Sequence, residues 1–163
     1  MIAVESVPKR KELARHFGAD VVIDFKEQDP VQAILDLTGG QGVDSAIEAL
    51  GAQTTFAACV RVTRPGGTVS NIGYHGDGDY VQIPRLDWGV GMGDKTIRTG
   101  LCLGGAERMK RLMRLIEVGR VDPRPLTSHR FPFREVEKAF RMMQTKEDGM
   151  LKPLVLFDES TAR

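Results

Sequence analysis

The sequence predicts an α/β fold built on a parallel, Rossmann-like sheet. Short β-branched apolar runs alternate with amphipathic helical patterns, and Gly, Pro or Asp residues bound most of these segments. The connections between them are short, as in regular β-α-β units. A chain of 163 residues is long enough to bury a sizeable core.

The first part of the chain alternates strictly between strand and helix. Pro8 suits a first helical turn, and Gly18 suits the position that stops that helix. Asp29 and Pro30 open the next helical pattern, which Gly39 and Gly40 end. The expected elements are strand 2–4, helix 8–17, strand 21–24, helix 30–38, strand 43–49, helix 53–62 and strand 68–72.

This rhythm breaks over residues 74–95, which are rich in glycine and contain the single tryptophan, Trp88. A loop of this length inside a compact domain is usually functional or part of an interface. Pro123 and Pro125 later mark an exit from the layered unit. The remaining expected elements are strand 96–103, helix 106–118 with Met109, Leu112, Met113 and Ile116 facing inward, extended segment 128–131, helix 134–144, strand 150–157 and a polar tail at 158–163.

Charge and cysteine content narrow the function classes. The 23 Lys and Arg residues nearly balance the 22 Asp and Glu residues, so no nucleic-acid or membrane partner is expected. No apolar stretch reaches membrane-spanning length and no signal peptide follows Met1, so a cytoplasmic location is expected. Cys59 and Cys102 are far apart and are interpreted as small buried hydrophobes.

No metal site and no catalytic residue is expected in this chain. The three histidines, His16, His75 and His129, lack metal-ligand spacing and are interpreted as surface or packing residues. The pair Gly89 and Gly91 neither follows a strand nor opens a helix, so it is not a dinucleotide-binding turn.

Several segments, in order, resemble the zinc-dependent medium-chain alcohol dehydrogenases. They are AVESVP at residues 3–8, FGAD at 17–20, TGGQGVD at 38–44 and RPGG at 64–67. SNIGYHG at 70–76, IPRLDWGVGM at 83–92 and GLCLGG at 100–105 are similar to the bacterial secondary-alcohol dehydrogenase branch. LTSHRFPFREVEKAF and MLKPLVL resemble the segment in which that family's chain returns to its catalytic domain.

The resemblance implies a domain division. Residues 1–121 would form a partial NAD-binding Rossmann domain, 122–157 the C-terminal segment of the catalytic domain, and 158–163 a tail. The family's zinc ligands, Gly-rich turn and first strand are expected upstream of Met1. Without that central strand, the pair at 2–4 and 21–23 would slide against strand 43–49, accept a strand from another chain, or stay loose.

The resemblance also implies a function. In a complete enzyme, zinc would polarise a small-molecule alcohol or ketone, and hydride would pass between it and the nicotinamide cofactor. This chain would supply cofactor contacts and an oligomer surface for a dimer or tetramer. The isolated chain is expected to be inactive and to bind no zinc. The alternative is a stand-alone nucleotide-binding or assembly module without catalytic activity.

Glu5 is the candidate that decides cofactor choice. At the end of a second Rossmann strand, a carboxylate accepts hydrogen bonds from the adenosine ribose hydroxyls and repels a 2′-phosphate. NADP-using relatives tend to carry a small residue there with a basic residue nearby, whereas Val7 offers no phosphate partner. NAD is therefore expected to be preferred over NADP. The alternative is an acid placed near a helix N-terminus for its dipole.

Four further candidates come from the same resemblance. Ser6 belongs to the strand-acid-helix segment and is expected to contact the cofactor. Arg10 matches a basic position aimed at the ribose, or is an ordinary solvated helix charge. Phe25 would edge the adenine pocket, unless it only packs. Lys146 would lie near the pyrophosphate, or is an exposed lysine after a helix.

The nicotinamide end of the cofactor is assigned to two turns. Leu50 and Gly51 follow one strand and Gly73 and Tyr74 follow the next, where open α/β sheets bind ligands. Turn formation at Gly51 and loop anchoring by Tyr74 are the alternatives. Trp88 and Met92 match a loop that related tetramers project toward a neighbour's substrate pocket; anchoring or interface packing is the alternative.

Overall fold

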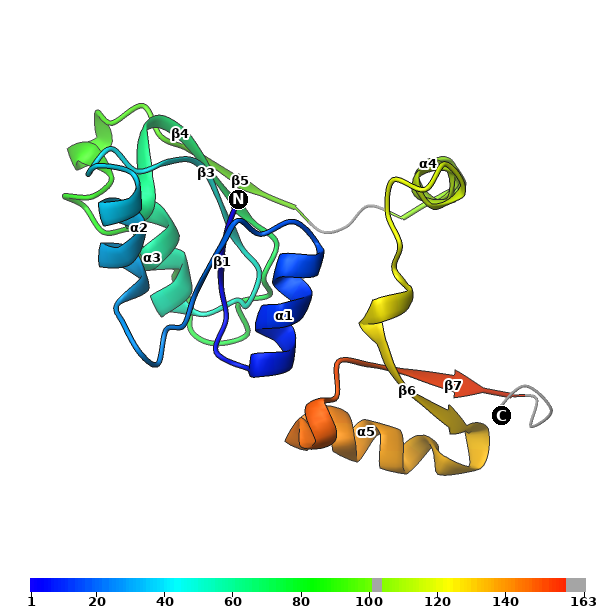
Figure 1. Cartoon of the computed structure of the whole chain (residues 1–163). Coiled ribbons are helices and arrows are strands. Elements are labelled where there is room, and N and C mark those ends of the chain that lie inside the picture. Colours follow the sequence, from blue (N-terminus) through cyan, green and yellow to red (C-terminus); the bar gives the residue numbers. More distant parts are fainter. Residues whose placement is uncertain (101–103, 158–163) are drawn as a thin grey trace. The chain divides into compact units, whose positions relative to one another are not determined.

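The computed structural model describes residues 1–100 and 104–157 of the chain. The chain divides into two compact units, Met1–Leu103 and Gly104–Arg163 (Figure 1). The division predicted after residue 121 remains a prediction. Among the described residues, no helix has both the length and the apolar character needed to cross a bilayer.

The first unit contains two parallel sheets with helices between their strands. Strands β1 and β2 form one sheet, and β3, β4 and β5 form the other, in that order. Helices α2 and α3 lie side by side (Figure 1). The elements are β1 (Ile2–Val4), α1 (Pro8–His16), β2 (Val21–Ile23), α2 (Pro30–Leu37), β3 (Val43–Glu48), α3 (Gln53–Val62), β4 (Thr63–Asn71), a 3-10 turn at Gly89–Gly91 and β5 (Thr96–Thr99).

The local signals in the sequence explain the helix boundaries. Pro8 occupies the first turn of α1, and Gly18 follows its end with a φ of +95°. The Asp29 side chain accepts a hydrogen bond from the Val31 N–H at 3.0 Å and caps α2. These boundaries agree with the predicted helices.

An apolar cluster connects the two sheets of the first unit, whose strands are not hydrogen-bonded to each other. Ile23, Ile34 and Val62 are buried together, and side chains from β1, β2, α2 and β3 pack around them. The β1–β2 pair is not hydrogen-bonded to β3, so the predicted possibility of sliding against that strand is not realised. Hydrophobic contact is non-directional and can bridge two sheets whose backbone groups do not pair.

A second cluster anchors the long loop. Phe56, Val60 and Val69 are buried, and Trp88 packs against them with Cys59 and Ile97. Loop anchoring, one of the two alternatives given for Trp88, therefore holds within this unit. Met92 is 85% exposed and stays a candidate for an interface.

One strand boundary was predicted wrongly. Strand β4 begins at Thr63, not at residue 68, because Val43 already pairs with Thr63 before the register shifts to Ser45 opposite Thr68. The RPGG segment forms the irregularity between the two pairings. A β-bulge accommodates extra residues inside a ladder, whereas proline and glycine at this place in the sequence indicated the end of the preceding helix and a strand that starts after them.

The second unit is smaller. Strands β6 and β7 pair in parallel, and helix α5 connects them in the sequence. Phe131, Ala139 and Met150 form the buried apolar cluster of this unit. Its elements are α4 (Ala106–Glu117), a 3-10 turn at Arg124–Leu126, β6 (Thr127–Pro132), a 3-10 turn at Phe133–Glu135, α5 (Val136–Thr145), a 3-10 turn at Glu147–Gly149 and β7 (Lys152–Leu156).

Helix α4 has one apolar face that its own unit leaves open. Met109, Leu112, Met113 and Ile116 are between 40% and 61% exposed, and their predicted inward orientation stays a prediction. The helical pattern predicts which side chains share a face. Whether another element covers that face depends on long-range contacts that the pattern does not encode. The end of predicted strand 96–103 and the predicted tail at 158–163 lie outside the described residues.

Candidate functional site

The first cluster of candidate residues surrounds the end of β1. The Glu5 N–H donates to the Ile23 carbonyl at 3.0 Å, so the β1–β2 pairing continues to this residue. Its Oε1 accepts hydrogen bonds from the backbone N–H groups of Ser6 at 2.8 Å and Val7 at 3.0 Å. The carboxylate is therefore held in place at the start of α1, with its side chain 25% exposed.

Arg10 reaches the same carboxylate from α1. Its Nη1 lies 3.9 Å from Glu5 Oε2, and the Arg10 side chain is 30% exposed. The structure thus brings Glu5, Ser6 and Arg10 together. Because Val7 is the N-cap of α1 and has no side-chain cap of its own, the helix-dipole role given as the alternative for Glu5 is compatible with the same geometry.

Asp24, at the end of β2, was not singled out from the sequence. It accepts hydrogen bonds from Lys11 Nζ at 2.7 Å and from the Lys26 N–H at 2.9 Å. The Lys11 hydrogen bond is the main cause that lowers the pKa of Asp24, followed by the Lys26 N–H. The neighbouring Phe25 is 51% exposed, so its ring does not belong to the core.

The second cluster is organised by Glu48, the last residue of β3, which is only 1% exposed. Its carbonyl oxygen accepts hydrogen bonds from the N–H groups of Ile72 at 2.8 Å and Gly73 at 3.1 Å. Its side-chain Oε1 accepts from the N–H groups of Leu50 at 2.9 Å and Gly51 at 2.8 Å. One residue therefore binds the turn after β3 and the turn after β4.

Those two turns cross so closely that neither glycine has room for a side chain. A Cβ on Gly51 would lie 2.0 Å from the Tyr74 carbonyl oxygen, and a Cβ on Gly73 would lie 2.2 Å from Glu48 Oε2. Gly51 also has a φ of +89°, which favours glycine. The Leu50 and Tyr74 side chains are 70% and 87% exposed, so the backbone of both turns forms the crossing.

Three polar side chains complete this cluster. The Thr55 hydroxyl lies 2.7 Å from Glu48 Oε1. Asn71 Nδ2 donates to the Gly73 carbonyl at 3.0 Å, and Asn71 Oδ1 lies 2.9 Å from His75 Nε2. The same His75 nitrogen is 3.7 Å from Glu48 Oε2.

The charge of Glu48 is maintained despite its burial. Burial is the largest influence and raises the pKa of Glu48. The hydrogen bonds from Gly51, Thr55 and Leu50, with the nearby His75 ring, together lower the pKa below its ordinary value. A carboxylate that closes a strand and precedes a turn is the sequence signal that could have identified Glu48; Thr55 and Asn71 carried no comparable signal.

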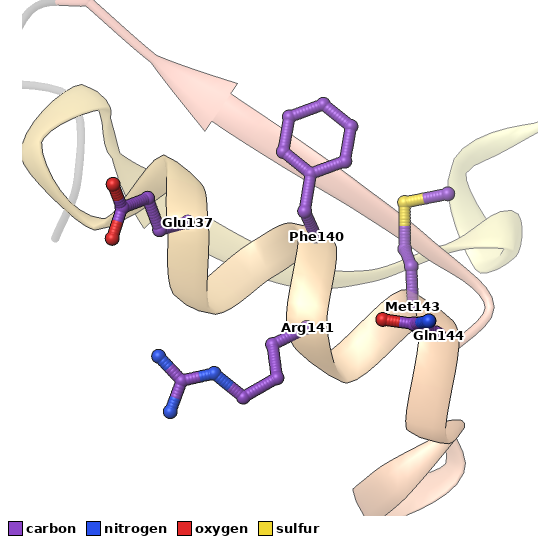
Figure 2. A pocket seen from close by; sticks show the side chains of 5 residues that line it. All are labelled: Glu137, Phe140, Arg141, Met143 and Gln144. Atoms are coloured by element: carbon purple, nitrogen blue, oxygen red, sulfur yellow. The ribbon is translucent and has the colours of Figure 1, made fainter.

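Lys146 belongs to the second unit, where it follows α5 with a φ of +57°. A hollow in that unit is lined by side chains of α5 alone, so it is an open helix face without converging groups (Figure 2). Its lining residues are Glu137, Phe140, Arg141, Met143 and Gln144.

The described residues contain no group of three His, Cys, Asp or Glu side chains that could hold a metal ion. Burial, and then the charge of Glu48, raises the pKa of the Cys59 thiol to about 11. Cys59 is thus a neutral, half-buried packing residue, as predicted from its place in a helix. Cys102 lies outside the described residues.

Comparison with known proteins identifies the family of this chain. A family model described as zinc-binding dehydrogenase matches residues 1–118. The chain belongs to the zinc-binding dehydrogenase family. It is 43% identical over 157 residues to an NADP-dependent isopropanol dehydrogenase of Thermoanaerobacter brockii, and 43% identical over 152 residues to an alcohol dehydrogenase of Cupriavidus necator.

The solved structures that resemble this chain include alcohol dehydrogenases, in agreement with the family match. A zinc-dependent alcohol dehydrogenase from Streptococcus pneumonia matches 99% of the chain with 31% identity and a TM-score of 0.83. Alcohol dehydrogenase TADH from Thermus sp. ATN1 matches 96% with 28% identity and a TM-score of 0.82. The alignments to the two curated relatives span 96% and 93% of this chain, but only 45% and 41% of the relatives' own lengths.

Proposed function

We propose that this chain binds a nicotinamide dinucleotide and forms the cofactor-binding portion of an alcohol dehydrogenase. The observation that carries the proposal is the fixed Glu5 carboxylate at the end of β1. Two backbone N–H groups occupy part of its hydrogen-bonding capacity, and an ionised carboxylate has about four acceptor sites. The remaining sites can accept the two hydroxyls of an adenosine ribose.

The two crossed turns supply a second contact region in this proposal. Gly51 and Gly73 lack side chains at the carboxyl ends of β3 and β4, so a ligand can approach their backbone groups closely. These residues would hold the nicotinamide end, which accepts or donates hydride when the cofactor is bound. Ser6, Arg10 and Phe25 would serve the adenosine end, and Lys146 the pyrophosphate.

We further propose a preference for NAD over NADP. The relative from Thermoanaerobacter brockii is named as NADP-dependent, so its name points to the opposite cofactor preference. The support lies in the chain's own residues: a 2′-phosphate would meet the Glu5 carboxylate, and Val7 offers it no hydrogen-bond donor from its side chain. Arg10 could attract a phosphate, but it already lies 3.9 Å from Glu5.

Calorimetric titration of the chain with NADH and NADPH tests this choice. We expect tighter binding of NADH, and the double variant Glu5→Gly with Val7→Arg should weaken or reverse that preference, because it removes a repulsive charge and adds a phosphate partner. Glu12→Gln, which removes an exposed carboxylate of α1, serves as the matched control. An unchanged preference ratio in the double variant would show that Glu5 does not read the ribose.

The alternative function is a nucleotide-binding or assembly module that carries out no hydride transfer. Incubation with a secondary alcohol and NAD separates the two when the chain is part of a complete dehydrogenase, because both functions predict no turnover for the chain alone. We expect no turnover and no stoichiometric zinc for this chain alone, and an alcohol dehydrogenase activity for a protein that contains it with its catalytic partner segment. One tightly bound zinc per chain together with NAD reduction would refute the first expectation.

A further inference from the structure

Glu48 is the residue that connects the two crossed turns. Its carbonyl oxygen accepts from the turn after β4, through Ile72 and Gly73. Its side chain accepts from the turn after β3, through Leu50 and Gly51.

The three donors at Oε1 favour an ionised carboxylate. Two N–H groups and the Thr55 hydroxyl converge on this one oxygen at 2.7 to 2.9 Å. Hydrogen bonds to an ionised acceptor are roughly twice as strong as neutral ones. Because burying a charge is costly unless it is compensated, these three donors explain how Glu48 stays ionised at 1% exposure.

The second oxygen has a different role. Glu48 Oε2 is buried and has no hydrogen-bond partner among the described residues. His75 Nε2 lies 3.7 Å from it but is 2.9 Å from Asn71 Oδ1. Instead, Oε2 faces Gly73, whose Cβ would lie 2.2 Å away. An unsatisfied buried oxygen is costly, and such a cost in a folded protein calls for an explanation.

We propose that Glu48 is a positioning residue that sets the separation of the Leu50–Gly51 and Gly73–Tyr74 turns, and thereby the fit of the nicotinamide half of the cofactor. Oε1 holds the first turn, the carbonyl oxygen holds the second, and Oε2 limits how closely the second turn can approach. Asn71 fixes the far side of the second turn through the Gly73 carbonyl. This role rests on the cofactor site proposed above.

Ligand truncation separates positioning from general stability. NADH contains the nicotinamide half, and ADP-ribose lacks the nicotinamide ring. In the full chain, Glu48→Gln should weaken NADH binding by at least about tenfold while ADP-ribose binding changes by less than about twofold. Bound NADH should also lose the fluorescence change that reports an enclosed nicotinamide. Glu12→Gln, on an exposed face of α1, should leave both affinities unchanged.

A second pair of variants covers the case in which Glu48→Gln fails to fold. Thr55→Val removes one donor to Oε1 and should shift NADH binding in the same direction by a smaller factor, whereas Thr55→Ser keeps the hydroxyl and should restore binding. Equal losses for NADH and ADP-ribose, or no loss for either, would overturn the proposal.

Amide exchange in the ligand-free chain distinguishes this proposal from the function on which it rests. Glu48→Gln, or Thr55→Val in its place, should accelerate exchange at Gly51 and Gly73 together, without changing Val7 near Glu5. If wild type binds neither ligand, the proposed cofactor site is wrong, and the exchange result alone then decides whether Glu48 positions the turns. Unchanged exchange at Gly73 overturns that role.

Discussion

Replacing Gly51 by alanine tests the crossing of the two turns directly. The new Cβ would lie 2.0 Å from the Tyr74 carbonyl oxygen, 2.4 Å from its carbonyl carbon and 2.8 Å from its nitrogen. These are backbone atoms, so the contact cannot be relieved by a side-chain rotation. Inserting a methyl into such a close contact costs about 1–3 kcal/mol.

A second glycine provides the matched control. Gly18 has a φ of +95°, close to the +89° of Gly51, but a Cβ built on Gly18 meets nothing within 4 Å. Each alanine variant bears a similar left-handed backbone cost of about 1–2 kcal/mol. The two variants also change the unfolded chain alike. The difference between them therefore isolates the steric conflict with Tyr74.

Urea denaturation measures this difference. Trp88 is the single tryptophan and packs on the cluster of Phe56, Val60 and Val69, so its fluorescence reports unfolding of the first unit. We expect Gly51→Ala to lower the free energy of unfolding by about 1–3 kcal/mol more than Gly18→Ala. Equal losses in the two variants would show that the turns after β3 and β4 are not in close contact.

Two further predictions concern pH and association. Because the folded pKa of Asp24 is lowered, first by Lys11, its contribution to stability is fully present above the unfolded pKa of about 3.9 and is lost as pH falls through the folded value. Lys11→Met should make the acid-side slope of stability shallower, whereas Lys9→Met should not; identical slopes would contradict the pairing. Light scattering should find self-association through exposed strand edges, and hydrogen exchange should find residues 2–23 less protected than 43–72. A monomer with uniform protection would refute both expectations.

The element order and the family followed from the sequence because their signals are local. Pro8, Gly18 and Asp29 act within one helical turn, and the predicted helices begin and end near where the structure has them. The parallel pairing of β3 with β4 also follows from the β-α-β rhythm, because helix α3 connects the two strands. The ordered motifs identified the dehydrogenase family, which the family match to residues 1–118 confirms.

What the tertiary structure decided involves contacts between distant segments. Glu48 accepts hydrogen bonds from donors on two turns, and His75 contacts Asn71, but neighbouring residues in the sequence do not identify these partners. The start of β4 depends on a pairing with Val43 that no local pattern encodes. Local propensity and periodicity determine which residues form a strand or share a face, whereas the partners of a buried polar group are set only when the chain folds and excludes water from them.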